Sequence, residues 1–217
     1  MPHVDGLAAV GDLPGPMSRL RRIVLVRHGE TDGNSSARYH GAADVDLSAE
    51  GRDQMRAAAA RLEGELLDLV VASPLRRAWR SAWIVARGRP VRLEADFREV
   101  HFGRWEGMTS DEIRASDPIL YEDWLAGKPG FEYPGGESRA AFQERVERGL
   151  DRLLSAPARG ALVVAHKGVI RTIIQELTGE TLDRERPALG EVVGVSREPD
   201  GSWFVGRHSS DPPALSA

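Results

Sequence analysis

Residues 23–31 read IVLVRHGET, a run of β-branched and leucine side chains followed directly by charged and polar ones. A continuous apolar run of this length is typical of a strand that is buried on both faces of a sheet. Residues 69–71 and 161–165 have the same character. Strands of this kind occur in mostly parallel sheets that helices cover on both sides, so the sequence predicts an α/β protein.

The segments between these strands have the apolar spacing and the end signals of helices. Ser48 and Ser138 stand where N-caps are expected, because a serine hydroxyl can accept a hydrogen bond from a free backbone N–H of the first turn. Ser73 and Pro74 predict the start of another helix, as a cap and a first-turn proline. Residues 168–177 predict a fourth helix, with its apolar side chains at helical spacing.

The end of the domain predicts a β-hairpin, formed by residues 191–196 and 203–207 around a Pro-Asp-Gly turn. Together with the helices, these strands predict a three-layer α/β/α sandwich with a mostly parallel central sheet. The hairpin leaves an edge strand near Trp203 that could pair two chains, which makes a homodimer possible.

Composition sets the limits of the domain and of its partners. We expect residues 21–208 to form one domain, between a disordered Gly- and Pro-rich leader (1–20), in which Met17 is an alternative start, and a loose tail (209–217). A net charge of −4 argues against a general nucleic-acid or membrane binder. The absence of cysteine excludes disulfides and thiol catalysis. With no signal peptide and no long apolar run, we expect a cytoplasmic protein.

Polar residues follow three of the predicted strands where each strand ends. Arg27 and His28 follow the first strand, and His166 follows the strand at 161–165. Arg76 and Arg77 lie one turn into the helix that follows the strand at 69–71. Ligands of open α/β sheets bind at the carboxyl ends of the strands. Imidazole and guanidinium groups gathered at one edge predict a site for an anion.

The motifs resemble those of the histidine phosphatase (phosphoglycerate mutase-like) superfamily, and its cofactor-independent phosphatase branch in particular. RHGET at residues 27–31 with Asn34, SPLRRA at 73–78, REV at 98–100 before WEG at 105–107, PGGES at 134–138 and VAHKGV at 164–169 occur in the family's order. The resemblance covers roughly residues 22–180. It implies a phosphatase that acts on a small phosphate ester without a metal or another cofactor.

The resemblance also implies a role for each matching residue. His28 is the expected nucleophile and Glu99 the proton donor, with Asp96, Glu106 and Glu112 as competing carboxylates. A protonated His166 is expected to act in catalysis and to hold the phosphoryl group. The other phosphate-binding residues that it implies are Arg27, Arg77 and Asn34, with Arg76 facing solvent. The two histidines could instead bind a metal, but no third ligand stands at metal-site spacing and the arginines would repel a cation.

The expected reaction has two steps: phosphoryl transfer to His28, then hydrolysis of the phosphohistidine by water that Glu99 activates. A phosphoglycerate mutase and a non-catalytic phosphate-binding protein are the alternatives. Substrate selection is expected in a lid formed by residues 100–133, which includes Trp124. The residues expected to act in this lid are His101, Arg104 and Trp105, together with Lys167, which replaces the glycine more usual in the family.

Overall fold

The computed structural model describes residues 19–206, so the predicted tail and most of the predicted leader, Met17 included, lie outside the described residues. Leu20, which the prediction assigned to the leader, has no exposed surface and packs into the core. The folded domain therefore begins before residue 21. Within the described range, none of the helices is long and apolar enough to cross a membrane.

A six-stranded sheet forms the centre of the domain, in the order β3-β2-β4-β1-β5-β6. The first four strands of this order are parallel, and β5 and β6 are antiparallel to their neighbours. This confirms the predicted mostly parallel sheet. The strands are β1 (Arg22–Arg27), β2 (Leu69–Ala72), β3 (Arg92–Leu93), β4 (Gly160–Ala165), β5 (Val192–Arg197) and β6 (Trp203–Gly206).

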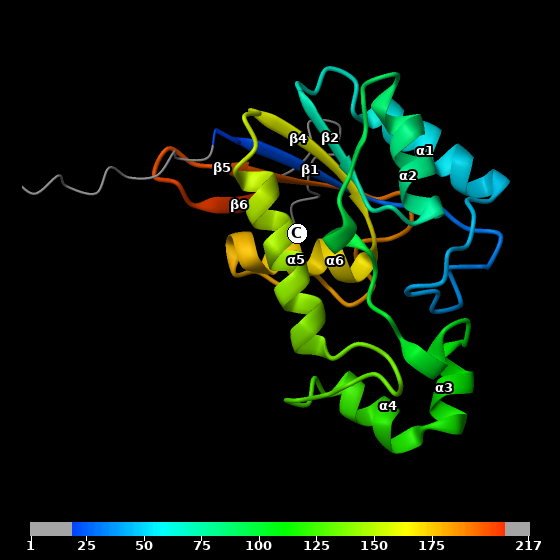
Figure 1. Ribbon diagram of the computed structural model, residues 1–217. Helices are drawn as coiled ribbons and strands as arrows, with labels where there is room; N and C mark the ends of the chain where they lie inside the picture. The colour runs from blue at the N-terminus through cyan, green and yellow to red at the C-terminus, as the bar shows by residue number, and fades with distance from the viewer. Residues whose placement is uncertain (1–18, 207–217) are drawn as a thin grey trace, which may run out of the picture.

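Alternate residues of the central strands pack on opposite faces of this sheet. Ile23 and Leu25 of β1 belong to a core with α5 (Arg139–Leu154) and α6 (Lys167–Thr178). Val24 and Val26 belong to a second core with α1 (Ala49–Arg61) and α2 (Arg76–Ala86). The period of two along a strand thus explains why the apolar run is continuous, and it builds the predicted three-layer sandwich (Figure 1).

Two short helices, α3 (Ser110–Ser116) and α4 (Pro118–Leu125), lie together away from the sheet, at the bottom of Figure 1. They follow two single 3₁₀ turns, η1 (Ala95–Phe97) and η2 (Gly103–Trp105). Buried aromatic side chains join this segment to the core that carries α5 and α6. The segment is the region that the sequence assigned to a lid.

The helix caps confirm two predictions and correct a third. Ser48 and Ser138 each accept a hydrogen bond from the third residue beyond them, at 3.0 and 3.1 Å. The prediction for Ser73 is wrong, because α2 begins three residues later, at Arg76. The hydroxyl of Ser73 instead lies 2.8 Å from Nε2 of His166, so it serves the edge of the sheet and not the helix.

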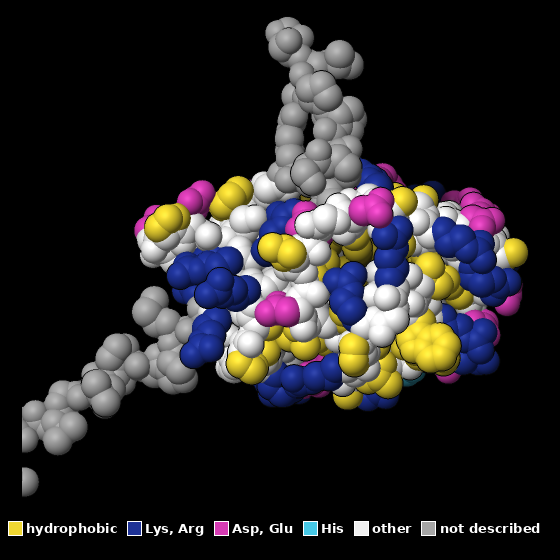
Figure 2. Space-filling model, turned by 90° about the horizontal axis from the view of Figure 1, so that it is seen from above, with side chains coloured by type: hydrophobic (Ala, Val, Ile, Leu, Met, Phe, Trp, Pro, Cys, Tyr) yellow, Lys and Arg dark blue, Asp and Glu magenta, His cyan; other side chains and the backbone are white. Residues whose placement is uncertain are grey.

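Strand β6 is the last strand on its side of the sheet, and its Phe204 is 39% exposed. The homodimer expected from this edge stays a prediction. On the face seen from above in Figure 2, hydrophobic side chains occur in small groups between basic and acidic ones. This view therefore shows no broad apolar patch.

Candidate active site

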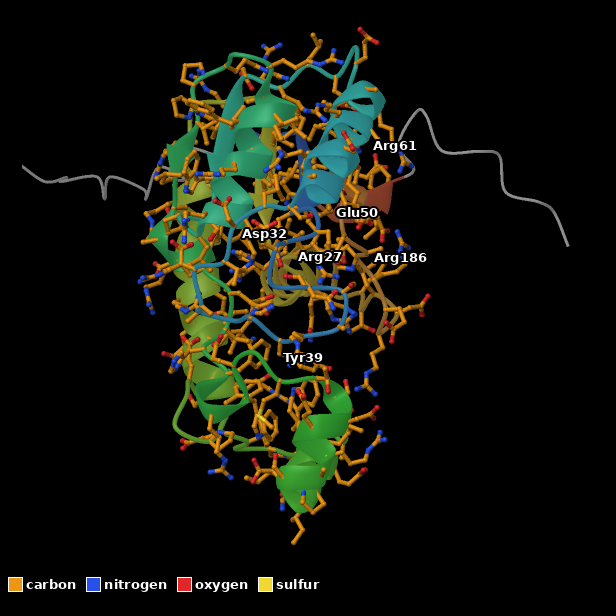
Figure 3. The ribbon with its side chains drawn as sticks, turned by 90° about the vertical axis from the view of Figure 1, so that its right-hand side faces the viewer. Arg27, Asp32, Tyr39, Glu50, Arg61 and Arg186 are labelled. Carbon is orange, nitrogen blue, oxygen red and sulfur yellow. The ribbon has the colours of Figure 1, made fainter. Side chains whose placement is uncertain are left out.

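The pairing of β1 with β4 brings the two histidine motifs together. Arg27 lies opposite Ala165 in parallel register, so His28 and His166, the next residues of the two strands, leave the sheet side by side. Their ring centroids are 5.1 Å apart, and both side chains are buried. Figure 3 shows Arg27 near the middle of the molecule, with Tyr39 between it and the α3–α4 segment.

Hydrogen bonds fix the tautomer of His28. Its Nδ1 lies 2.7 Å from the carbonyl oxygen of Gly29, which can only accept, so Nδ1 carries the proton. Its Nε2 lies 3.3 Å from Nε of Arg77, which can only donate. The unprotonated Nε2, with its lone pair, is therefore the nitrogen available for attack on an electrophile in the cavity.

The surroundings of His28 also keep the ring neutral. Burial lowers its pKa well below the ordinary value of 6.5, and the positive charges of Arg77 and Arg27 lower it further. A neutral imidazole retains the lone pair that a nucleophile needs at neutral pH.

Arg77 has 1% of its surface exposed, whereas the neighbouring Arg76 points outward to Asp44. The guanidinium of Arg77 donates to the carbonyl oxygens of Ala43 at 2.7 Å and Gly41 at 2.6 Å, as well as to His28. Burial lowers the pKa of Arg77 to about 10, so it stays charged at neutral pH. The fixed guanidinium is a cation suited to a phosphoryl group.

Two buried polar atoms beside His28 lack a hydrogen-bond partner among the described residues: Nε of Arg27 and Nδ1 of His166. Unpartnered buried polar atoms are uncommon, and at a cavity they indicate a ligand that supplies the missing partner. Burial lowers the pKa of His166 well below 6.5, with the charge of Arg77 as the next cause, so these surroundings keep His166 neutral. The protonated state expected from the sequence would need the charge of a bound anion.

Glu99 approaches the same site from the segment before α3. Its Oε2 accepts from the backbone N–H of Gly168, in the first turn of α6, at 3.0 Å. A Cβ added at Gly168 would lie 2.5 Å from Oε1 of Glu99, so this glycine makes room for the carboxyl group. The other predicted carboxylate candidates have structural partners: Asp96 lies by Arg152, Glu106 binds backbone N–H groups and Glu112 caps α3.

The cavity at this edge has a volume of about 820 Å³. Arg27, His28, Arg77, Glu99 and Lys167 all line it, as the sequence predicted for a shared site. An aromatic wall that sequence reasoning largely missed completes the lining. Its members are Tyr39, Phe102, Trp124 and Tyr133. Trp124 was named for the lid, Phe102 and Tyr133 fall within the predicted lid segment 100–133, and Tyr39 lies outside it.

Five predicted site residues are not among the side chains that line the cavity. One of them is His166, which is buried beside His28. Asn34 is exposed and adopts a positive φ of 63°, which fits a turn residue, and Ser35 and Ser36 line the cavity instead. Three side chains predicted for the lid also lie outside the lining. His101 and Arg104 are exposed, and Trp105 is buried with its Nε1–H donating to Asp117.

Within residues 19–206, no three histidine or carboxylate side chains gather in a way that could hold a metal ion. The positive charge in the cavity instead comes from arginine and lysine side chains. The described site is therefore built for an anion.

Comparisons with known proteins agree with this geometry. A glucosyl-3-phosphoglycerate phosphatase from Mycolicibacterium vanbaalenii is 36% identical over 191 residues, which cover 82% of this chain and 83% of that protein. Phosphoserine phosphatase 1 from Hydrogenobacter thermophilus is 31% identical over 166 residues, covering 75% and 79%. The crystal structure of the alpha-ribazole phosphatase from Shigella flexneri has a TM-score of 0.74 at 28% identity, covering 87% of this chain and 96% of that one. The model of the histidine phosphatase superfamily (branch 1) matches residues 23–205, so the chain belongs to that superfamily.

Proposed function

We propose that this chain hydrolyses small phosphate monoesters through a phosphohistidine on His28. The observation that carries the proposal is the fixed tautomer of His28, whose unprotonated Nε2 faces a cavity that Arg27 and Arg77 make positive. The names of the relatives support phosphatase chemistry. Their named substrates differ, so family membership leaves the alcohol part of the ester open.

In the first step, Nε2 of His28 attacks phosphorus, and a P–N bond forms as the P–O bond to the alcohol breaks. The proton on the leaving oxygen comes from Glu99, which must be protonated at that moment. Phosphoryl oxygens approaching the site supply acceptors for the unpartnered Arg27 Nε and His166 Nδ1. These donors stabilise the charge of the transferring group.

In the second step, the Glu99 carboxylate accepts a proton from water, and the oxygen of that water attacks phosphorus. The P–N bond breaks, so inorganic phosphate leaves and His28 regains its lone pair. The backbone N–H of Gly168 holds the carboxyl group in place for both steps. One carboxyl group thus acts first as an acid and then as a base.

Phosphate release from a panel of small phosphate esters, in the presence of a chelator, tests the proposal. We expect release by the wild-type chain and none above background by His28→Ala. Brief reaction with ³²P-labelled ester followed by alkaline quench should label the wild type, because phosphohistidine survives alkali, and should leave the variant unlabelled. Full activity in His28→Ala would refute the proposal, and absence of release from every ester would turn attention to phosphoglycerate isomerisation. The cytoplasmic location stays a prediction that cell fractionation can check.

A further inference from the structure

The cavity is strongly positive although the whole chain is negative. Seven arginine and lysine side chains line it against three glutamates, while the chain as a whole carries a net charge of −4. A phosphoryl group carries at most two negative charges, so it accounts for only part of this excess. The cations beyond the phosphoryl end therefore need a separate explanation.

Three of the seven cations already have a role. Arg27 and Arg77 stand beside His28 at the phosphoryl end. Arg38 donates to Glu112 at 3.0 Å and to a backbone carbonyl, so a carboxylate offsets its charge. The remaining four are Arg139, Lys167, Arg171 and Arg184.

Three of these four gather on one wall, formed by α6 and the loop that follows it. Lys167 and Arg171 lie one turn apart on α6, and Arg171 donates to the carbonyl oxygens of Asp183 and Arg186 in that loop. Arg184 belongs to the same loop. Burial lowers the pKa of Lys167, and the charges of Arg27, Arg171 and Arg184 lower it further, while Glu185 opposes this shift.

The described residues provide little negative charge to balance this wall. Glu185 lies 3.9 Å from Nζ of Lys167, but its side chain is 91% exposed, and such a solvated pair is weak. Neither Arg171 nor Arg184 forms an ion pair within residues 19–206. Glu176, the other glutamate outside the phosphoryl end, accepts instead from the side chain of Gln143.

We propose that the preferred substrate carries a second anionic group on its alcohol part, and that Lys167, Arg171 and Arg184 bind it. This inference rests on the proposed phosphatase activity and adds the chemical class of the leaving group. A carboxylate or a second phosphate satisfies the chemistry. Lys167 is the residue that links the two ends, since it follows His166 directly.

The aromatic wall completes the proposed leaving-group site. The guanidinium of Arg184 lies over the Trp124 ring, 5.8 Å from its centroid, so the cationic loop and the α4 segment meet across the cavity. Trp124 also donates to the hydroxyl of Tyr133 at 2.9 Å. The carbon skeleton of the alcohol would therefore lie between aromatic faces and the cations of α6.

Two esters with the same three-carbon skeleton test the proposal. 3-Phosphoglycerate carries a carboxylate where glycerol 3-phosphate carries a neutral hydroxymethyl group. We expect kcat/KM for phosphate release to be at least about tenfold higher for the carboxylate, and the preference to shrink with added salt because salt screens exposed charges. A second comparison, of fructose 1,6-bisphosphate with fructose 6-phosphate, tests whether a second phosphate has the same effect.

Charge variants assign the preference to residues. Arg184→Gln and Lys167→Gln should each lower kcat/KM for the anionic ester about tenfold more than for its neutral partner, and Arg184→Glu should lower it further. Arg184 is the cleaner site, because its side chain is exposed and its guanidinium lies over the Trp124 ring. Arg56→Gln removes the same charge from an exposed position on α1, outside the cavity, and should leave the preference unchanged.

Each outcome distinguishes the inference from the proposed function. Equal kcat/KM for both members of both ester pairs, or equal losses on both members in Arg184→Gln and Lys167→Gln, would refute the second-anion site while leaving the phosphatase intact. A preference in one ester pair alone would identify the anion as carboxylate or phosphate. Failure of the wild type to release phosphate from any ester would instead contradict the proposed function.

Discussion

A single guanidinium links three parts of the candidate site. Arg77 donates from Nε to His28 and from its two terminal nitrogens to the carbonyl oxygens of Ala43 and Gly41. A lysine ammonium cannot reproduce this planar set of donors, although it carries the same charge. The role of Arg77 is therefore one of geometry as well as charge.

We expect Arg77→Lys to lower kcat/KM by about 10²-fold or more, on the scale seen for the loss of one transition-state donor. The matched control is Arg76→Lys, the neighbouring residue, whose side chain is about half exposed and faces Asp44. That variant should change kcat/KM by less than about threefold, as exposed substitutions usually do. Steady-state kinetics on one ester measures both, and similar losses in the two variants would contradict the assignment.

The sequence identified most of the residues at the phosphoryl end because strand ends concentrate them. Arg27, His28 and His166 each follow an apolar run, and the parallel register of β1 and β4 brings them together. Tyr39 had no such signal, since it lies in a loop and contacts Trp124 only through the fold. Arg184 resembled an ordinary solvated arginine until the fold placed it on the cavity.

At the scale of elements, the first turn of α6 positions the proposed acid. Gly168 donates its N–H to Glu99, and an added Cβ would lie 2.5 Å from Oε1 of Glu99 and 3.2 Å from Cζ of Phe142. Its backbone is helical, so alanine suits the local conformation and favours the helix. The added methyl group would clash with the carboxyl group of Glu99, which is flexible enough to move away.

Gly168→Ala should therefore lower kcat by about 10²-fold, the usual range for one acid–base group, while the melting temperature changes by only a few degrees. Binding of inorganic phosphate, followed by calorimetry, should stay within about threefold, because the cations at the phosphoryl end remain. Loss of phosphate binding in parallel with kcat would show that the variant disturbs more than Glu99.

The carboxylate of Glu106 holds the loop whose backbone carbonyls accept hydrogen bonds from Arg77. The carboxylate of Glu106 accepts from the backbone N–H groups of Ala42 at 2.8 Å and Phe102 at 3.0 Å. This loop carries the carbonyl of Gly41, which accepts from Arg77. Glu106 thus acts on the site through the backbone and is a positioning residue.

We expect Glu106→Gln to lower kcat/KM about tenfold and to weaken phosphate binding. The second carboxylate oxygen, which accepts from the N–H of Ala43 at 3.2 Å, is replaced by an –NH₂ that cannot accept. A merely structural effect would lower stability and leave phosphate affinity unchanged. Glu144→Gln, an exposed change of the same kind on α5, is the control and should alter neither quantity.

Helix starts show where element-level prediction has its limit. Ser48 and Ser138 cap their helices as expected, since each hydroxyl accepts from a backbone N–H of the first turn. Ser73 has the same local pattern, but its hydroxyl lies by His166, a residue distant in sequence. Trp105 was expected in the substrate lid, yet its side chain is buried and its Nε1–H donates to Asp117. Local patterns cannot reveal either long-range contact.

At the scale of the whole molecule, the site and the stability of the fold depend on the same two buried histidines. Burial and neighbouring arginines lower the pKa values of His28 and His166 well below 6.5. Both rings are released in the unfolded chain, where the histidine pKa is about 6.5. Below that pH, the unfolded chain binds protons that the native protein does not, so acid favours unfolding.

The free energy of unfolding should therefore fall as the pH drops from about 6.5 to 5, by up to about 1.4 kcal/mol per pH unit for each histidine. Above about pH 6.5 this contribution is fully present. Urea unfolding at several pH values measures this dependence of the free energy of unfolding on pH. His28→Gln and His166→Gln should each reduce the number of protons taken up on unfolding by about one, whereas Arg56→Gln should leave that number unchanged. Hydrogen bonds from Arg152 lower the pKa of Glu94, so the stability that Glu94 contributes is lost only below about pH 4.5, outside this window. A slope unchanged in both histidine variants would show that neither ring is held neutral by the fold.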